Sequence, residues 1–328
     1  MSLQNPLYFT DYGAAYVGNS LLLLDKLETD SVDLVLTSPP FALQRKKTYG
    51  NVEQEEYVDW LFEFCKKVHR VLSQTGSFVI DLGGAYQSKR PIRSLHNYRI
   101  LLRLCDDLEF RLAEEFFWFN PAKLPSPIEW VNKRKIRAKD AVNTVWWLSK
   151  TDHPKANVSN VLVPYSDRMK KLQANPEKYY TPKGRPSGHD IGNKFATNNG
   201  GAIPSNLLEI PNTESNSNYI KICKSISISP HPARFPQKLP MFFIKFLTDP
   251  GDKVLDIFAG SNTTGFVAEG LGRKWIAFEQ DSGYLAASAF RFLSKFQNPS
   301  NALALYENLL RQQEPMYLTN PKQLAMEL

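Results

Sequence analysis

The sequence predicts a doubly wound α/β domain with a mixed sheet and an irregular insert. Apolar runs typical of strands alternate with helical patterns through the first 150 residues, as this fold class requires. Periodicity is lost over 151–229, where Pro, Gly, Asn, Ser and Lys dominate; after this insert, a strand, a glycine turn and a helix follow at 254–265. We therefore expect one domain formed by 1–150 and 230–328, with 151–229 as a separate region.

Each element has a local signal. A short strand at 15–17 precedes a turn and a Leu-rich helix at 21–27, and the run 55–72 places Trp60, Phe64 and Val68 at helical spacing. The other strands are expected at 32–36, 77–82, 112–118, 142–148 and 274–278, and the other helices at 92–108, 238–247, 284–296 and 304–311.

Composition limits the classes of function. The 328 residues carry 40 basic and 33 acidic side chains, and the net charge of +7 favours a polyanionic partner without demanding one. No apolar run reaches membrane-spanning length and the first ten residues do not resemble a signal peptide, so we expect a cytoplasmic protein. Cys65, Cys105 and Cys223 lie far apart without metal-ligand spacing, so neither disulfides nor a metal site is expected.

The turn after the predicted strand Val32 to Leu36 carries chemical groups. Pro39 and Pro40 cannot continue a sheet, so the chain must leave the sheet edge there. The Ser38 hydroxyl and the Pro39 carbonyl can accept two N–H bonds, and Phe41 offers a flat apolar face. This set fits a planar ring with an exocyclic amine, such as a flipped nucleobase. A proline-stiffened loop without chemistry is the alternative reading.

A nucleotide-binding pattern begins at Val254. A strand runs into a Gly-containing turn and a helix, and a second strand ends at Glu279, where an acidic side chain would meet a ribose diol. The full GxGxxG pattern and a P-loop lysine are both missing, so a nucleoside without pyrophosphate, such as S-adenosylmethionine, fits better than NAD. The cofactor-binding candidates here are Asp256, Phe258, Gly260, Ser261, Asn262, Thr263, Thr264 and Glu279.

With SPPF at 38–41 preceding DIFAGSNTTG at 256–265, the chain resembles the β-class amino-methyltransferases of DNA, whose motif order is permuted. SPPF is similar to the cytosine-N4 branch, whereas the adenine-N6 branch more often has DPPY. The similarity to cytosine-N4 members extends from about Tyr16 to Leu293, including the run His231 to Pro236. The absence of a Pro-Cys loop argues against carbon-5 methylation, which needs a thiolate.

The resemblance implies an enzyme that transfers a methyl group from S-adenosylmethionine to the N4 amine of a flipped cytosine in duplex DNA. It implies a bacterial restriction-modification system, CAGCTG as the first target to try, a companion endonuclease that acts separately, and a monomer. Ser38, Pro39, Pro40 and Phe41 would be the catalytic residues. Asn19, where the family usually has Asp, would accept a bond from adenine, and Phe235 would flank the methionine part of the cofactor. A turn role suits His231 better than that of a general base.

Cationic and polar side chains in three regions are candidate DNA contacts. The loop after Phe41 and the Trp130 region would meet phosphates, and 151–229 would be the target-recognition region that reads base edges. The candidates are Arg45, Lys46, Lys47, Lys133, Arg134, Lys135, Arg185, His189, Lys194 and Asn198. A solvated surface is the alternative for each cluster. Adenine-N6 methylation, a non-catalytic DNA-binding protein of the same fold and, more distantly, an NAD-dependent oxidoreductase also remain open.

Overall fold

The structure is a computed structural model that describes residues 3–41, 56–176, 196–213, 217–293, 298–311 and 314–318. It contains two compact units. The larger comprises Met1–Ala156 and Asn206–Leu328, and the smaller is Asn157–Ser205. Residues 206–229, which the sequence analysis placed with the insert, therefore pack with the α/β unit.

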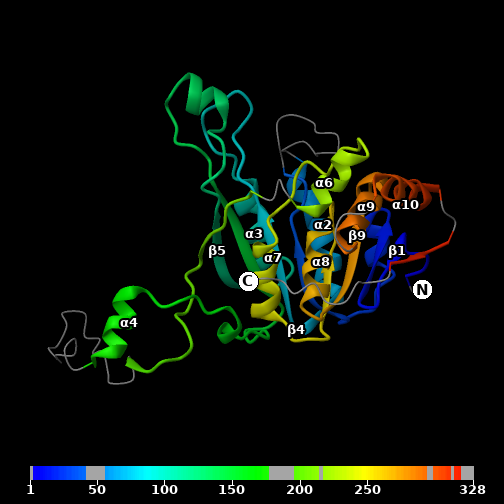
Figure 1. Cartoon of the computed structure of the whole chain (residues 1–328). Helices are drawn as coiled ribbons and strands as arrows, with labels where there is room; N and C mark the ends of the chain where they lie inside the picture. The colour runs from blue at the N-terminus through cyan, green and yellow to red at the C-terminus, as the bar shows by residue number, and fades with distance from the viewer. Residues whose placement is uncertain are drawn as a thin grey trace. The chain divides into compact units, whose positions relative to one another are not determined.

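The larger unit is built on a mixed sheet of ten described strands, in the order β10-β1-β2-β9-β8-β3-β4-β6-β5-β7 (Figure 1). Neighbouring strands from β2 through β9, β8 and β3 to β4 are parallel, and β6 is antiparallel to both β4 and β5. The strands are β1 Tyr8–Phe9, β2 Gly13–Val17, β3 Val32–Thr37, β4 Leu72–Leu82, β5 Arg111–Phe119, β6 Val142–Ser149, β7 Leu207–Glu209, β8 Lys253–Asp256, β9 Lys274–Glu279 and β10 Met316–Tyr317. All the strands expected from the sequence are present.

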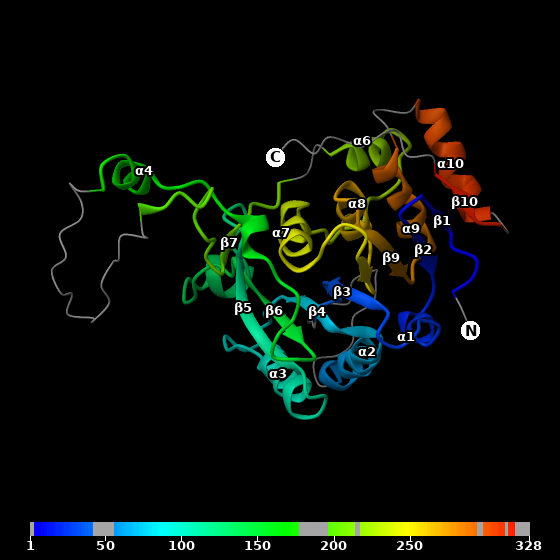
Figure 2. The ribbon, with the colours of Figure 1, turned by 90° about the horizontal axis from the view of Figure 1, so that it is seen from below.

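Helices cover both faces of this sheet, as Figure 2 shows. One face carries α1 Ser20–Leu24, α2 Tyr57–Val71 and α3 His96–Asp106. The other carries α7 Lys238–Leu247, α8 Thr263–Gly270 and α9 Ser282–Ser288, with α6 Asn218–Ser225 and α10 Pro299–Arg311 packed beside α9. The doubly wound mixed sheet is confirmed. None of the helices in the described ranges is long and apolar enough to cross a bilayer.

Successive side chains of a strand point to opposite faces of the sheet, so apolar strands form a core on each face. In β3, Leu34 and Leu36 pack against α7, while Val35 faces the α2 side. Leu61, Phe64 and Val68 of α2 are buried because a spacing of three to four residues places them on one helix face. These burials stabilise the sheet that carries the candidate site.

The sequence analysis missed the strands β1, β7 and β10 and the helices α4 and α6, because each is short or lies in the region of poor periodicity. Strands β1 and β10 are two residues long, and a two-residue run has no readable period. In the small unit, the helix α4 Asp167–Ala174 begins at Ser166, whose hydroxyl accepts a bond from the Met169 N–H at 3.2 Å. Short π-helical and 3-10 turns occur at Glu129–Lys133, Val158–Val161 and Ala289–Phe292.

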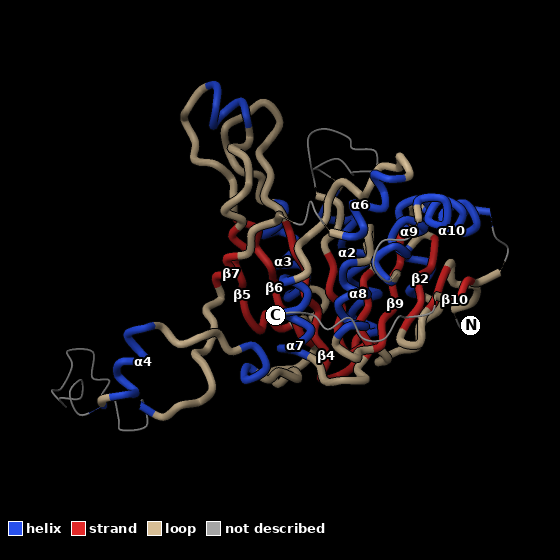
Figure 3. The backbone as a smooth tube through the Cα atoms, in the orientation of Figure 1, coloured by secondary structure: helices blue, strands red, loops and turns tan. Residues whose placement is uncertain are grey.

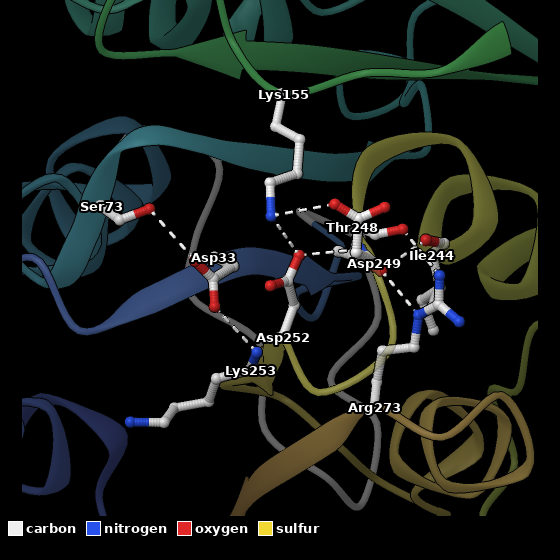
Figure 4. A network of polar contacts seen from close by, with 9 residues as sticks. All are labelled: Asp33, Ser73, Lys155, Ile244, Thr248, Asp249, Asp252, Lys253 and Arg273. Atoms are coloured by element: carbon white, nitrogen blue, oxygen red, sulfur yellow. Dashed lines mark hydrogen bonds and ion pairs between the residues drawn. The ribbon is translucent and has the colours of Figure 1, made fainter.

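The amino ends of the central strands are joined by a polar network (Figure 4). Lys155 Nζ lies 2.7 Å from Asp252 Oδ2, just before the chain enters the small unit. One carboxylate oxygen of Asp33 accepts a bond from the Lys253 N–H at 2.9 Å, which joins β3 to β8. This edge is therefore occupied by structural contacts, and the opposite, carboxyl edge is left for a ligand.

The tight pairing of β2 with β9 gives a test of the fold. A Cβ on Gly13 would lie 2.2 Å from the Trp275 carbonyl oxygen, so Gly13→Ala should lower the free energy of unfolding by about 1–3 kcal/mol. Urea unfolding would measure the loss. Ala14→Ser is the matched control, because Ala14 lines an open surface pocket. Equal stability of Gly13→Ala and the wild type would contradict this packing.

Candidate active site

The parallel strands β2, β9, β8, β3 and β4 end at the same edge of the sheet, where α/β folds bind their ligands. Figure 3 shows loops in tan rising from this edge, among them the connection between β5 and β6. The motif turns at 38–41 and 256–265, far apart in sequence, both leave this edge from the adjacent strands β3 and β8.

The Ser38 hydroxyl is oriented by a buried carboxylate. Its Oγ lies 3.0 Å from Asp81 Oδ2, and Asn143 Nδ2 donates to the other carboxylate oxygen at 3.0 Å. The three residues come from the neighbouring elements β3, β4 and β6. Because a carboxylate can only accept, Ser38 donates its proton to Asp81 and keeps its lone pairs for a donor on a bound molecule.

Burial adjusts the acidity of Asp81. Removal from water raises the pKa of this carboxyl to about 6, opposed by the bonds from Asn143 and Ser38 and by the positive charge of Lys123. Asp81 is therefore ionised at neutral pH, yet it takes up a proton more readily than an exposed aspartate would. A carboxylate with these properties suits a proton acceptor.

Phe41 lies against the end of β4. A Cβ on Gly83 would approach its ring to 2.4 Å, so the ring contacts the Gly83 backbone directly. Asn97 Nδ2 donates to the Gly83 carbonyl at 3.3 Å and fixes this segment from behind. Glycine is required at 83 for close approach, and the aromatic face stands beside the Ser38 turn.

A second buried carboxylate, Asp256, joins the two motif turns. Its Oδ1 accepts bonds from Thr37 Oγ1 at 2.7 Å and from the Phe258 N–H at 3.1 Å, and its Oδ2 accepts one from Thr264 Oγ1 at 2.7 Å. Burial raises its pKa, and these three bonds oppose the rise. Asp256 is thus a framework residue that fixes the distance between the turns.

Glu279 is placed to meet a ligand at the end of β9. Its carboxylate accepts bonds from the Gly260 N–H at 2.8 Å and from the Asp281 N–H at 2.9 Å, and burial raises its pKa. Each oxygen keeps a lone pair for a hydroxyl donor. Asn19 follows the adjacent strand β2, where its exposed side chain caps α1 by accepting from the Leu21 N–H.

The glycine turn itself is firmly supported. Asn262 adopts a left-handed conformation with φ of 50°; its side chain is buried, accepts from the Gly265 N–H and donates to Tyr8 Oη. Ser261 is buried and receives two bonds from Arg291. Thr263 is also buried. The side chains of 261–264 therefore hold the turn, and what the turn can offer a cofactor is its backbone.

His231 supports Gly260 from the other side. Its ring lies within 3.0–3.2 Å of where a Gly260 Cβ would stand, its Nδ1 is 2.6 Å from the Ala233 carbonyl oxygen, and burial lowers its pKa to about 4. A neutral histidine bonded to backbone fits the turn role expected for it.

The two aromatic cofactor candidates pack on opposite faces of the sheet. Phe235 is partly buried against the core of the α7 face. Phe258 packs on Phe64 of α2, with ring centroids 4.9 Å apart.

The structure describes four of the predicted DNA contacts, and the other six lie outside the described residues. Lys133 and Arg134 are exposed and both pair with Glu129, at 3.4 Å and 2.9 Å, and neighbouring Lys135 has φ of 55°. Asn198 is exposed in the small unit and accepts from the Gly200 N–H. The candidates outside the described residues are Arg45, Lys46, Lys47, Arg185, His189 and Lys194.

Comparisons with known proteins agree with this arrangement. The model of the family described as DNA methylase, covering amino-N6 and amino-N4 enzymes, matches residues 32–290. The chain belongs to this DNA methylase family. Type II methyltransferase M.PvuII of Proteus hauseri is 59% identical over 307 residues, covering 94% of this methylase and 91% of its relative.

The methylase is also similar to a solved structure and to a more distant adenine methyltransferase. The solved PvuII DNA methyltransferase, titled cytosine-N4-specific, has a TM-score of 0.79 and 49% identity, and the match covers 96% of this chain and 99% of that one. DNA adenine methyltransferase YhdJ of Escherichia coli K12 is 26% identical, with 82% and 78% covered.

Sequence reasoning missed three residues of this methylase's site: Asp81, Asn143 and Lys123. The signal for Asp81 was a lone acid in the apolar run Ser77 to Leu82, at the carboxyl end of a strand next to the catalytic turn. Asn143 and Lys123 had no comparable signal, because an antiparallel strand and a loop bring them there.

Asp81→Asn tests the proton-acceptor geometry. An amide at 81 that accepts from Asn143 must donate to Ser38, which reverses the Ser38 bond, so methyl transfer should fall by about 10²-fold or more. Wild-type turnover should rise through pH about 6 as Asp81 ionises. Exposed Asp107→Asn is the control, and unchanged turnover in Asp81→Asn would contradict this role.

The same variant has an opposite expected effect on stability. The folded pKa of Asp81, about 6, exceeds the ordinary 3.8, so the folded state binds the proton more tightly and wild-type stability falls as pH rises between these values. Asp81→Asn lacks this loss and should gain up to about 3 kcal/mol at pH 8. Thermal unfolding at pH 4.5 and pH 8 would measure it; a larger gain at the lower pH would contradict the sign.

Proposed function

We propose that this methylase transfers the methyl group of S-adenosylmethionine to the N4 amine of a flipped cytosine in duplex DNA, at a specific sequence. The observation that carries the proposal is the Ser38 hydroxyl, held by Asp81 beside Phe41 and tied through Asp256 to the Gly260 turn. Its similarity to the cytosine-N4-specific PvuII enzyme over nearly the whole chain supports the choice of base.

The site would act on the amine by hydrogen bonding. The lone pair of the cytosine N4 is delocalised into its ring, so the nitrogen is a weak nucleophile until its hydrogens are held by acceptors. Ser38 Oγ and the Pro39 carbonyl accept these two hydrogens, and Phe41 stacks on the pyrimidine. The nitrogen would form its bond to the methyl carbon as the bond from that carbon to the sulfonium sulfur breaks, and the electron pair of the broken bond would stay on sulfur as a neutral thioether. The nitrogen would lose a proton to Ser38 Oγ, while Ser38 gives its own proton to Asp81.

The cofactor supplies an electrophilic methyl group on its sulfonium. The residues that would hold it lie on three adjacent strand ends. Glu279 would accept the ribose hydroxyls, Asn19 would lie near the adenine, and Gly260 allows close approach of the backbone. Phe258 and Phe235 would supply apolar contacts. Asp256, Ser261, Asn262, Thr263 and Thr264 act through the turn that they hold.

Target recognition is assigned to 151–229, within which Asn157–Ser205 forms a compact unit of its own. Asn198 and the neighbouring candidates Arg185, His189 and Lys194 supply donors and acceptors for base edges. The resemblance in this region makes CAGCTG the first sequence to test, and each altered base contact would change the binding free energy by about 1–3 kcal/mol. Action as a monomer, with a companion endonuclease working separately, completes the proposal.

Product analysis tests the proposal directly. The protein is incubated with methyl-labelled S-adenosylmethionine and mixed-sequence duplex DNA, the DNA is digested, and the labelled nucleoside is identified by mass spectrometry. N4-methylcytosine is the expected product. N6-methyladenine would overturn the choice of base, and cofactor binding without any labelled DNA would favour a non-catalytic protein of this fold.

Ser38→Ala separates chemistry from cofactor binding. The variant lacks the hydroxyl that passes the proton to Asp81, so kcat should fall by about 10²–10⁴-fold while the Kd for S-adenosylmethionine changes by less than about twofold. Single-turnover kinetics and calorimetry measure the two quantities. Ser31→Ala, at the opposite end of β3, is the matched control. A variant as active as the wild type would remove Ser38 from the mechanism.

A further inference from the structure

The loop between β5 and β6 presents apolar side chains to water beside the active site. Leu124 is 81% exposed, the highest value among the large hydrophobic residues that the structure describes, and Ile128 and Ile136 of the same loop are 61% and 49% exposed. Three such residues in one loop are costly in water and mark a surface that meets a partner.

Hydrogen bonds hold this loop in one conformation, and Leu124 is exposed in that conformation. Lys139 Nζ crosses the loop to the carbonyl oxygens of Pro121 and Lys123, at 3.1 Å and 3.2 Å, in the stretch just before Leu124. Pro125 follows Leu124 directly and restricts its backbone to extended conformations. Leu124 therefore stands on a braced turn.

The base of the loop is braced as well. Arg93 makes two bonds to the Asp140 carboxylate, at 2.7 Å and 2.9 Å, and the Asp140 N–H donates to the Ser126 carbonyl at 2.9 Å. Arg137 donates twice to the Pro91 carbonyl, at 3.0 Å and 2.6 Å. The loop is thereby fastened to the segment that follows β4, the strand of Asp81.

The charge around Leu124 matches a polyanion. Residues 120–140 contain six cationic and two acidic side chains, a net charge of +4. Both acids are already paired, Glu129 with Lys133 and Arg134, and Asp140 with Arg93. Two of the cations, Arg137 and Lys139, brace the loop, and the other four, Lys123, Lys133, Arg134 and Lys135, belong to the same loop as Leu124.

The loop also lies at the mouth of the site. The loop leaves β5 where Phe119 pairs with Val142, next to Asn143, whose side chain donates to Asp81 at 3.0 Å. The segment that carries Leu124 therefore leaves the sheet beside the carboxylate that orients Ser38. The positive charge of Lys123, next to Leu124, is one of the influences that oppose the rise of the Asp81 pKa. An exposed leucine on a cationic loop beside the proposed flipped-base site fits a known way of binding DNA. Proteins that distort duplex DNA insert leucine and similar residues between base steps while cations hold the phosphates.

We propose that Leu124 is a wedge that enters the base stack of duplex DNA next to the target cytosine and stabilises the unpaired duplex while the cytosine occupies the Ser38 turn. This inference rests on the proposed function. Leu124 is a positioning residue, because it contacts neither cofactor nor the reacting nitrogen. Its contribution is greatest when the target is fully paired and smallest when the base is already free.

The test compares two substrates that differ only in the partner of the target cytosine. One duplex is fully paired, and the other carries an abasic site opposite the cytosine, so that little flipping energy is needed. Leu124→Ser should lower kcat/KM on the paired duplex by about tenfold or more and on the abasic duplex by less than about twofold. Leu124→Phe keeps an apolar wedge and should retain activity on both. Leu102→Ser changes a leucine of α3 that is 59% exposed and serves as the control.

Each result has a definite meaning. Equal loss on both duplexes, or no loss on either, overturns the wedge while leaving the proposed function intact. Wild-type protein that methylates neither duplex overturns the proposed function and the wedge with it. A change in oligomeric state of Leu124→Ser in sedimentation, with paired and abasic duplexes affected alike, would overturn the wedge and assign Leu124 to a contact with a second copy of the chain. A 2-aminopurine at the target position gives a separate readout, since its fluorescence rise on binding should weaken in Leu124→Ser and persist in Leu102→Ser.

Discussion

The site depends on one buried carboxylate, Asp256. It receives Thr37 from the end of β3, Thr264 from the start of α8 and the Phe258 N–H between them. Burying a charge is unfavourable unless it is paired or hydrogen-bonded, and here three bonds offset the loss of water. Because these bonds join the turn that carries Ser38 to the turn that supports Gly260, they fix the separation of the two groups that methyl transfer must bring together. A catalytic distance set by framework bonds needs no contribution from the ligands.

The three acidic side chains of this edge differ because their surroundings differ. Asp256 has both oxygens occupied by protein donors, which suits a fixed support. Glu279 has backbone donors on one side and lone pairs left for hydroxyls. Among the described residues, Asp81 accepts hydrogen bonds from Asn143 and Ser38, and its pKa near 6 would let it accept a proton during a reaction and release it to water afterwards. The surroundings of each carboxylate therefore suit Asp256 to support, Glu279 to ligand binding and Asp81 to proton transfer.

Local patterns in the sequence predict most of the sheet and both motif turns, because a strand of period 2 and a proline stop are short-range signals. They do not predict which side chains of the turns face a ligand. Asn262 and Thr264 looked like cofactor contacts, yet a left-handed cap and a bond to Asp256 commit them to the framework. Asp81 and Lys123 join Ser38 only through the pairing of strands and the return of a loop, which no local pattern encodes. Short motifs therefore predict where the site lies, and contacts between residues far apart in the sequence complete it.

The braced loop of Leu124 and the small unit Asn157–Ser205 suggest a division of labour. Leu124, Lys123 and Asp81 all belong to the α/β unit, so under the proposed function one compact unit would both extract the base and position its amine. Sequence reading, as proposed for the small unit, would use side chains that belong to a separate compact unit. Substitutions there can change the target by a few kcal/mol per base pair while leaving Ser38, Asp81 and Asp256 unaltered. In such an arrangement the specificity of a methylase can change while its chemistry stays the same, because the distances among the reacting groups are fixed in the α/β unit.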